Sequence, residues 1–93
     1  MATETPPTQR CNFTTARPTL KQGSSGDAVK QAQCYLNSSL TGEPLVVDGQ
    51  FGPVTDAATR RFQVCADITV DGVIGAQTWS FLTFFSNSPG FAC

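Results

Sequence analysis

Two similar stretches decide the fold of this 93-residue chain. Residues 45–55 read LVVDGQFGPVT, and residues 68–78, 23 positions later, read ITVDGVIGAQT. Each stretch holds a short apolar piece, an Asp-Gly turn, one large apolar residue, and a Gly that leads into a helical pattern. The sequence therefore predicts an internal repeat in which a turn precedes a helix.

The residue types in each repeat explain how the turn closes. Asp48 and Asp71 can accept hydrogen bonds from backbone N–H groups two or three residues on, and the glycine after each can adopt a positive φ. The large apolar residues, Phe51 and Ile74, then point into the core. Each turn has only one Asp, whereas an EF-hand loop needs several oxygen ligands, so no calcium site is expected.

Three helices are expected from the spacing of the apolar residues. The first begins near Ser25 and frays at residues 37–39, the second covers about residues 53–64, and the third covers about residues 76–85. A Gly-Pro pair starts the second helix, where proline suits the first helical position. The predicted fold class is a small all-α three-helix bundle with two Asp-Gly turn repeats.

The composition excludes several classes of function. Charged residues make up 14%, and six Lys and Arg against seven Asp and Glu give a net charge of −1. Neither a nucleic acid nor a membrane surface is therefore an expected partner. The chain has no His, which removes the commonest general base and the usual zinc sites, so we expect no metal or cofactor. Because both turn aspartates are committed and the chain is too small to wall a cleft, we expect no catalytic residue.

Four cysteines in so short a chain indicate its compartment. Cys11, Cys34, Cys65 and Cys93 lie far apart and form no Cys-x-x-Cys pair. This pattern favours two disulfides and an oxidising setting, so the chain is expected to be secreted or extracellular. The sequence by itself allows all three possible pairings.

The chain ends differ from the middle in composition. Residues 1–10 are polar and proline-containing, lack the apolar stretch of a signal peptide, and are interpreted as a disordered lead-in to a mature chain. The domain is expected to span residues 11–86. Residues 87–93 are interpreted as a tail that Cys93 ties down.

The ordered string of motifs resembles the bacterial peptidoglycan-binding domain. Residues 18–29, PTLKQGSSGDAV, look like the opening of that domain, and Gln33 and Leu36 follow at the family spacing. The two repeats then match its doubled signature, VDGxFGPxT and VDGxIGxxTW. The resemblance covers roughly residues 18–83.

This resemblance implies a compact, non-catalytic module that anchors a secreted protein or enzyme to murein. It is strongest to the actinobacterial, Streptomyces-like members, and the N-terminal domain of a secreted zinc carboxypeptidase is similar. That similarity implies a Cys11–Cys93 disulfide and leaves Cys34 for Cys65. Asp67 stands where the family usually has Gly, so the loop before the second repeat is expected to differ.

A murein-binding groove is expected beside the second and third helices and the turns that precede them. It would take either the glycan or the stem peptide. The candidate ligand-binding residues are Asp48, Thr55, Arg60, Arg61, Gln63, Asp71, Thr78 and Trp79. Each also has a structural alternative: turn closure for the aspartates, capping for the threonines, loop bonding for the glutamine, core packing for the tryptophan, and ordinary solvation or pairing with Asp56 for the arginines.

Other uses of the same scaffold stay open. The chain could be a secreted protein–protein interaction module or a prosegment-like module, with Phe84, Phe85 and Phe91 as a docking patch, or a small structural or toxin-like domain. A fused or separate cell-wall hydrolase is the protein partner that the resemblance implies. The chain itself is expected to be a monomer.

Overall fold

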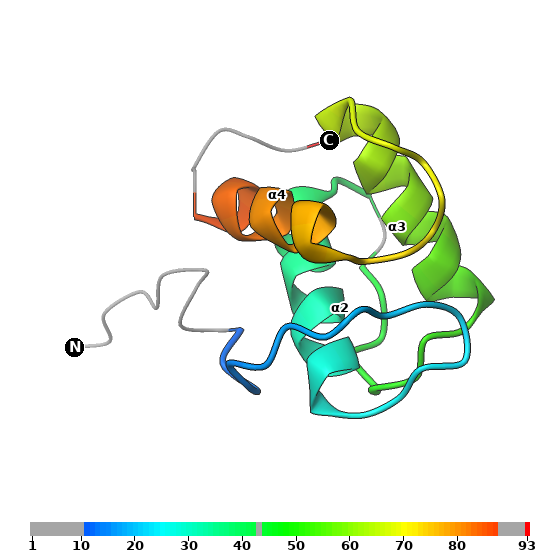
Figure 1. The fold of residues 1–93 in the computed structure, drawn as a ribbon, viewed down its shortest axis with the longest axis vertical. Coiled ribbons are helices and arrows are strands. Elements are labelled where there is room, and N and C mark those ends of the chain that lie inside the picture. Colours follow the sequence, from blue (N-terminus) through cyan, green and yellow to red (C-terminus); the bar gives the residue numbers. More distant parts are fainter. Residues whose placement is uncertain (1–10, 43, 88–92) are drawn as a thin grey trace.

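The computed structural model describes residues 11–42, 44–87 and Cys93, and the predicted lead-in 1–10 and Phe91 lie outside this part of the chain. Three helices follow one another, α2 (Asp27–Ser39), α3 (Pro53–Ala66) and α4 (Ala76–Ser86) (Figure 1). The prediction of an all-α three-helix fold is confirmed. None of the described helices is both long and apolar enough to cross a membrane.

The helix starts follow from the backbone before them. Gly52 and Gly75 precede α3 and α4 in extended conformations, and Pro53 is the first residue of α3. The first helix begins two residues later than predicted, at Asp27, because Ser25 forms an isolated antiparallel bridge with Gln50. Extended backbone at Ser25 is incompatible with a helical residue there.

The segment before α2 connects the two repeats. Leu20 exchanges both backbone hydrogen bonds with Ile74 of the second repeat, at N···O distances of 3.0 and 2.8 Å. Ser24, four residues after Leu20, accepts at its carbonyl from the N–H of Phe51 in the first repeat, at 2.9 Å. One short stretch of chain thus pairs with both Asp-Gly turns and fixes their separation.

The core is built where the three helices and the two turns meet. Phe51 and Ile74 are almost completely buried, as the repeat predicts. Phe62 of α3 contacts the partly buried Phe85 of α4 edge to face, with ring centroids 5.1 Å apart. The other buried apolar side chains are Cys11, Leu20, Val29, Ala32, Tyr35, Leu36, Ala58, Trp79 and Leu82.

All four cysteines form disulfides, but the pairing implied by the resemblance is wrong. The structure joins Cys11 to Cys34 and Cys65 to Cys93, with Cα–Cα distances of 5.5 and 5.9 Å. Neither Cys11–Cys93 nor Cys34–Cys65 is formed. Each disulfide instead fastens one terminal segment to one helix.

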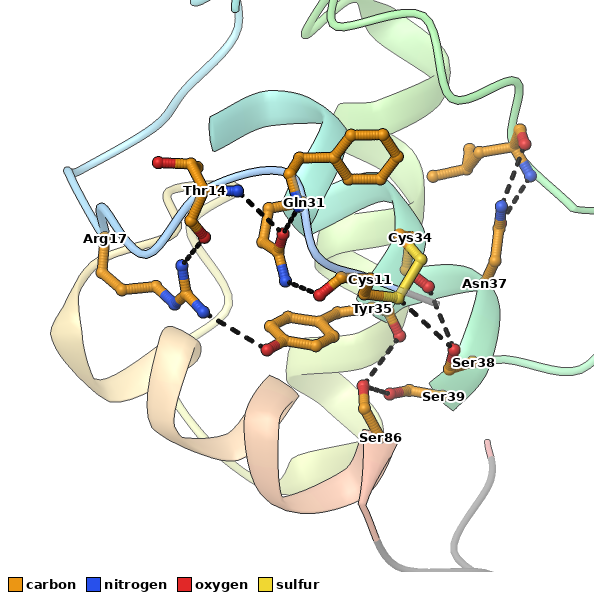
Figure 2. The surroundings of a disulfide bond; sticks show 12 residues. Cys11, Thr14, Arg17, Gln31, Cys34, Tyr35, Asn37, Ser38, Ser39 and Ser86 are labelled. Atoms are coloured by element: carbon orange, nitrogen blue, oxygen red, sulfur yellow. Dashed lines mark hydrogen bonds between the residues drawn. A yellow bond between two sulfur atoms is a disulfide. The ribbon is translucent and has the colours of Figure 1, made fainter. Parts of the chain in front are cut away.

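The Cys11–Cys34 pairing follows from Gln31, which lies one turn before Cys34 on α2 (Figure 2). Gln31 is buried, and its amide donates to the carbonyl of Cys11 at 2.5 Å and accepts from the N–H of Phe13 at 2.7 Å. This amide holds the N-terminal segment against the face of α2 that also carries Cys34. Residues three apart share a helix face, so Cys34 lies within reach of Cys11.

The Cys65–Cys93 pairing follows from the return of the chain to the end of α2. The N–H of Cys93 donates to the carbonyl of Ser39 at 2.7 Å, and the N–H of Thr41 donates to the carbonyl of Cys93 at 2.8 Å. Cys93 lies beside the last turn of α3, where Cys65 is located (Figure 1). Cys93 is therefore bonded to α3 rather than to Cys11.

Candidate functional site

A buried glutamine organises each Asp-Gly turn. In the first turn, the amide nitrogen of Gln33 donates to Asp48 Oδ1, to the carbonyl of Gln50 and to Thr55 Oγ1, at 3.0–3.1 Å. Its amide oxygen accepts from the N–H groups of Asp48 and Gly49 at 3.1 and 3.0 Å. Gln33 is 1% exposed, so α2 supplies an internal template for the turn that precedes α3.

Gln63 of α3 repeats this arrangement in the second turn. Its amide nitrogen donates to Asp71 Oδ1 and the carbonyl of Val73 at 3.0 Å each, and to Thr78 Oγ1 at 3.3 Å. Its amide oxygen accepts from the N–H groups of Asp71 and Gly72 at 3.1 and 3.0 Å. Loop bonding, the structural alternative given for Gln63, is thus observed, and Gln33 does the same in the first turn, both from buried positions.

The two turn aspartates serve these networks as hydrogen-bond acceptors. The Gln33 amide, followed by the N–H of Gln50, holds the pKa of Asp48 below its ordinary value. The N–H of Val73, followed by the Gln63 amide, does the same for Asp71, whose pKa the nearby Arg60 charge lowers further. Both carboxylates therefore stay ionised and close their turns, as predicted.

The two neighbouring arginines have different environments. Arg60 donates from Nε to Asp56 at 3.1 Å and from Nη2 to the carbonyl of Asp71 at 3.2 Å. This ion pair covers Gly72, whose φ is +72° and where a Cβ atom would collide with both side chains. Arg60 is thus committed to the second turn, whereas Arg61 donates to the carbonyl of Thr41 at 3.1 Å.

Trp79 is mainly a core residue. Its side chain is 3% exposed, and the indole N–H donates to the carbonyl of Pro18 at 2.8 Å. The guanidinium of Arg17 lies 5.1 Å from the indole centroid and also donates to the Tyr35 hydroxyl at 3.3 Å. Arg17 therefore covers the ring that a sugar would need for stacking.

A groove lies between the end of α2, the loop that follows it and α3. Its deepest part is a cavity of about 320 Å³, and a second cavity of about 240 Å³ continues it toward the first turn, with Leu45 and Val54 lining both. The residues around the deeper part are Asn37, Leu40, Gly42, Pro44, Leu45, Val54, Ala57, Ala58 and Arg61. The lining of this part is about half polar and half apolar, whereas the lining of the second cavity is mostly apolar. A concave surface with apolar contacts and a few polar groups is typical of a small-ligand site.

The groove continues past Arg61 toward the C-terminal disulfide. A cavity of about 370 Å³ there is lined by Leu40, Arg61, Val64, Cys65 and Cys93. Leu40 and Arg61 line both this cavity and the deepest part, so Arg61 borders two of the adjoining cavities. We call the three adjoining cavities the Arg61 groove.

The groove brings together only some of the predicted site residues. Asp48, Thr55 and Arg61 line it, whereas the second-turn residues Arg60, Gln63, Asp71 and Thr78 and the core residue Trp79 do not. The rest of the groove is lined largely by small aliphatic residues, which were not among the predicted candidates. The exposed valines 46 and 54 of the first repeat were the available signal, because an apolar residue with no place in the core marks a surface.

The described residues offer little for a metal. No group of three or more Cys, Asp or Glu side chains in residues 11–42, 44–87 and 93 is arranged to hold a metal ion. What the Arg61 groove offers instead is apolar contact, one cation at Arg61 and one carboxylate at Asp48.

Comparisons with known proteins place this geometry in context. A family model described as "Putative peptidoglycan binding domain" matches residues 25–82. An uncharacterised protein of Kitasatospora aureofaciens is 45% identical over 84 residues, covering 89% of this chain and 71% of the relative. The zinc D-Ala-D-Ala carboxypeptidase of Streptomyces albus G is 46% identical over 63 residues, covering 67% of this chain. The chain spans only 25% of that enzyme's length.

A solved structure agrees with the sequence comparisons. A peptidoglycan-binding protein from Clostridioides difficile superimposes with a TM-score of 0.70 at 32% identity, covering 76% of this chain and 44% of that protein. The matched region includes a common arrangement of helices at an identity well above that of unrelated chains.

Proposed function

Because this chain belongs to the peptidoglycan-binding domain family, we propose that it holds peptidoglycan in the Arg61 groove and performs no catalysis there. The family model covers more than half of the chain, from residue 25 to residue 82. The carboxypeptidase relative carries its activity on a much longer chain, of which the matched part is a quarter. We therefore propose a binding role for the part that the two chains share.

The observation that carries this proposal is the contrast between the two repeats. The second turn is covered by the Arg60–Asp56 ion pair, and its polar side chains bond one another. The first turn has the same internal network, and Lys30 packs over its Gly49, but no ion pair covers it among the described residues. Its Gly52, Pro53 and Val54 line the groove, so we propose this copy as the one that offers the ligand surface.

The proposal extends to the cellular role. We propose that the domain is secreted, acts as a monomer and keeps a fused or separate cell-wall hydrolase close to its polymer. Two disulfides favour an oxidising compartment. Tethering raises the effective concentration of an attached enzyme at the wall without any new contact at the active site.

Sedimentation with insoluble murein tests the binding role. The wild-type chain should sediment with purified sacculi at tens of micromolar. Ala57→Tyr, which fills the floor of the groove from an exposed helix position, should stay in the supernatant. Ser80→Tyr adds the same ring to the exposed face of α4 and is the matched control. A wild-type chain that never sediments would sink the proposal.

A protein-docking role is the second candidate, and one surface favours it. Ser80, Phe81 and Phe84 line an apolar depression of about 270 Å³ on α4, and Phe84 is 54% exposed. Loss of sedimentation in Ser80→Tyr but not in Ala57→Tyr would move the binding site to this face. Capture of a hydrolase domain that Ser80→Tyr abolishes would support docking.

A further inference from the structure

We infer that the Arg61 groove selects the stem peptide of peptidoglycan rather than its glycan, through small aliphatic contacts and one carboxylate placed on Arg61. This inference rests on the proposed function, because it names the part of the polymer that the same groove holds. The walls of the groove, the position of its cation and the state of its amide group each support it.

The walls match short aliphatic side chains. The apolar residues that line the three cavities are mainly alanine, leucine, valine, proline and glycine, beside polar residues that include Asn37, Asp48 and Arg61, and no Phe, Tyr or Trp lines any of them. The apolar face of a sugar needs a flat platform, and the one tryptophan is buried elsewhere, under Arg17. Ala57 and Ala58 present only methyl side chains to the cavity that they line. The groove therefore suits alanine-like residues better than pyranose rings.

The cation is held in place by the fold. Arg61 donates to the carbonyl of Thr41, whose N–H and hydroxyl both donate to the carbonyl of Cys93, at 2.8 and 2.7 Å. Cys93 is in turn bonded to Cys65, one turn after Arg61 on α3. This loop of contacts restrains Arg61 where it borders two of the cavities.

Arg61 also differs from Arg60 in its acidic partners. Within the described residues the only ion pair is Arg60–Asp56, so Arg61 has no carboxylate at ion-pair distance there. A guanidinium presents a planar set of donors that matches a carboxylate, and restraint lowers the entropy lost on binding. Arg61 thus offers a cation to an anionic peptide, although the ionised Asp48 lines another cavity of the groove, which Arg61 does not line, and the whole chain carries a net charge of −1.

The amide side chain in the cavity that Arg61 lines with Leu45 is already engaged. Asn37 donates to the carbonyl of Leu45 at 3.0 Å and accepts from its N–H at 2.7 Å. An N-acetyl group of the glycan would have to compete with this pair. Asn37 shapes the loop and leaves Arg61 as the other polar side chain of that cavity, whereas Gln33 and Gln50 line the cavity beside the first turn.

NMR titration with three soluble probes tests the inference. The probes are a synthetic stem peptide with free carboxylates, the same peptide with every carboxylate amidated, and a peptide-free N-acetylated glycan oligomer. The free peptide should shift the amide signals of Leu40, Leu45 and Ala57. The amidated peptide should bind at least about fivefold more weakly, and the glycan oligomer should cause no saturable shift.

Variants separate the groove cation from charge in general. Arg61→Gln should weaken binding of the free peptide at least about fivefold and leave the amidated peptide unchanged. Arg60→Gln removes the same charge one residue away, outside the groove, and should bind like the wild type. Glu43 lies outside the described residues, and Glu43→Gln should preserve the preference for the free peptide.

Each contrary result has a separate meaning. Saturable binding of the glycan oligomer in the groove, or equal binding of the free and amidated peptides, overturns the inference but leaves the proposed function standing. Equal loss in Arg60→Gln and Arg61→Gln also overturns it, because the effect would then be general charge. Sacculi that fail to sediment the wild-type chain refute the proposed function itself.

Discussion

Replacing Gln63 with alanine should remove about 3–5 kcal/mol of folding free energy. The side chain is 0% exposed and its amide makes five hydrogen bonds. Two of its partners, Thr78 Oγ1 and the N–H of Gly72, meet it in buried contacts, and an unsatisfied buried group costs about 1–3 kcal/mol. The other three partners reach water, so they add little. The free energy of unfolding of a small domain is about 5–15 kcal/mol in total, so this loss is a large share of it.

Urea denaturation of the wild-type and variant chains at neutral pH measures this loss. Gln33→Ala should show a loss of similar size, because the first turn has the same five-bond network. A loss below about 1 kcal/mol in Gln63→Ala, with an unchanged denaturant slope, would refute the reasoning. Water would then replace the amide at little cost.

Gln63→Glu separates hydrogen-bond polarity from cavity formation. The carboxylate keeps acceptors for the two turn N–H groups but faces the carboxylate of Asp71, to which the native amide donates at 3.0 Å. Burial and that neighbouring charge should raise the pKa of the new Glu in the folded state. Stability relative to the wild type should therefore recover as the pH falls from about 7 toward 5, where the group takes up a proton. The alanine variant should show no such recovery.

Three further outcomes are expected. The pKa values of Asp48 and Asp71 are lowered in the folded state, so both ionised carboxylates stabilise the fold at pH values above their ordinary pKa of 3.8. The urea midpoint should therefore fall as the pH drops below 3.8, and a constant midpoint from pH 5 to pH 2 would contradict this. Cys65→Ser opens a disulfide with a sequence separation of 28 and should cost up to about 3.5 kcal/mol in thermal unfolding. An unchanged melting temperature of Cys65→Ser would contradict the view that this disulfide restricts the unfolded chain. Gly72→Ala should cost about 1–3 kcal/mol in urea, mainly because alanine is strained at a φ of +72°, since the Asp56 and Arg60 atoms that its Cβ meets can shift. Gly52→Ala, with open space at its Cβ and a negative φ, should cost under about 0.5 kcal/mol, and equal effects would refute the role of the positive φ.

Much of the fold could be predicted because its signals are local. An Asp-Gly dipeptide followed by a large apolar residue specifies a turn and a core position, and Gly49 and Gly72 do have positive φ values. Asp67, expected to alter its loop, is the only described non-glycine residue with a positive φ, 59°, and it ends α3. Helix boundaries were predicted within about two residues because glycine, proline and apolar spacing all act within one turn.

The disulfide pairing and the groove could not be predicted in the same way. Pairing depends on how the terminal segments cross the helices, which Gln31 and Ser39 determine through contacts far along the chain. Resemblance supplied a pairing, but the relative's cysteines did not carry over. The groove depends on how the end of α2, the loop that follows it and α3 pack together. The different environments of Arg60 and Arg61 likewise appear only once α3 is packed.

The two glutamine networks also explain why the helix–turn repeat does not continue beyond α4 within the described residues. The helix before each turn supplies an amide that shapes it, first α2 and then α3. The position 23 residues after Gln63 is Ser86, at the end of α4, and its hydroxyl lies 3.3 Å from the carbonyl of Tyr35 and 3.4 Å from the hydroxyl of Ser39. The third helix thus bonds backward to the first, with a side chain too short to template another turn. Extending the array by a third unit would require an amide at this position and the loss of the contact that closes the bundle.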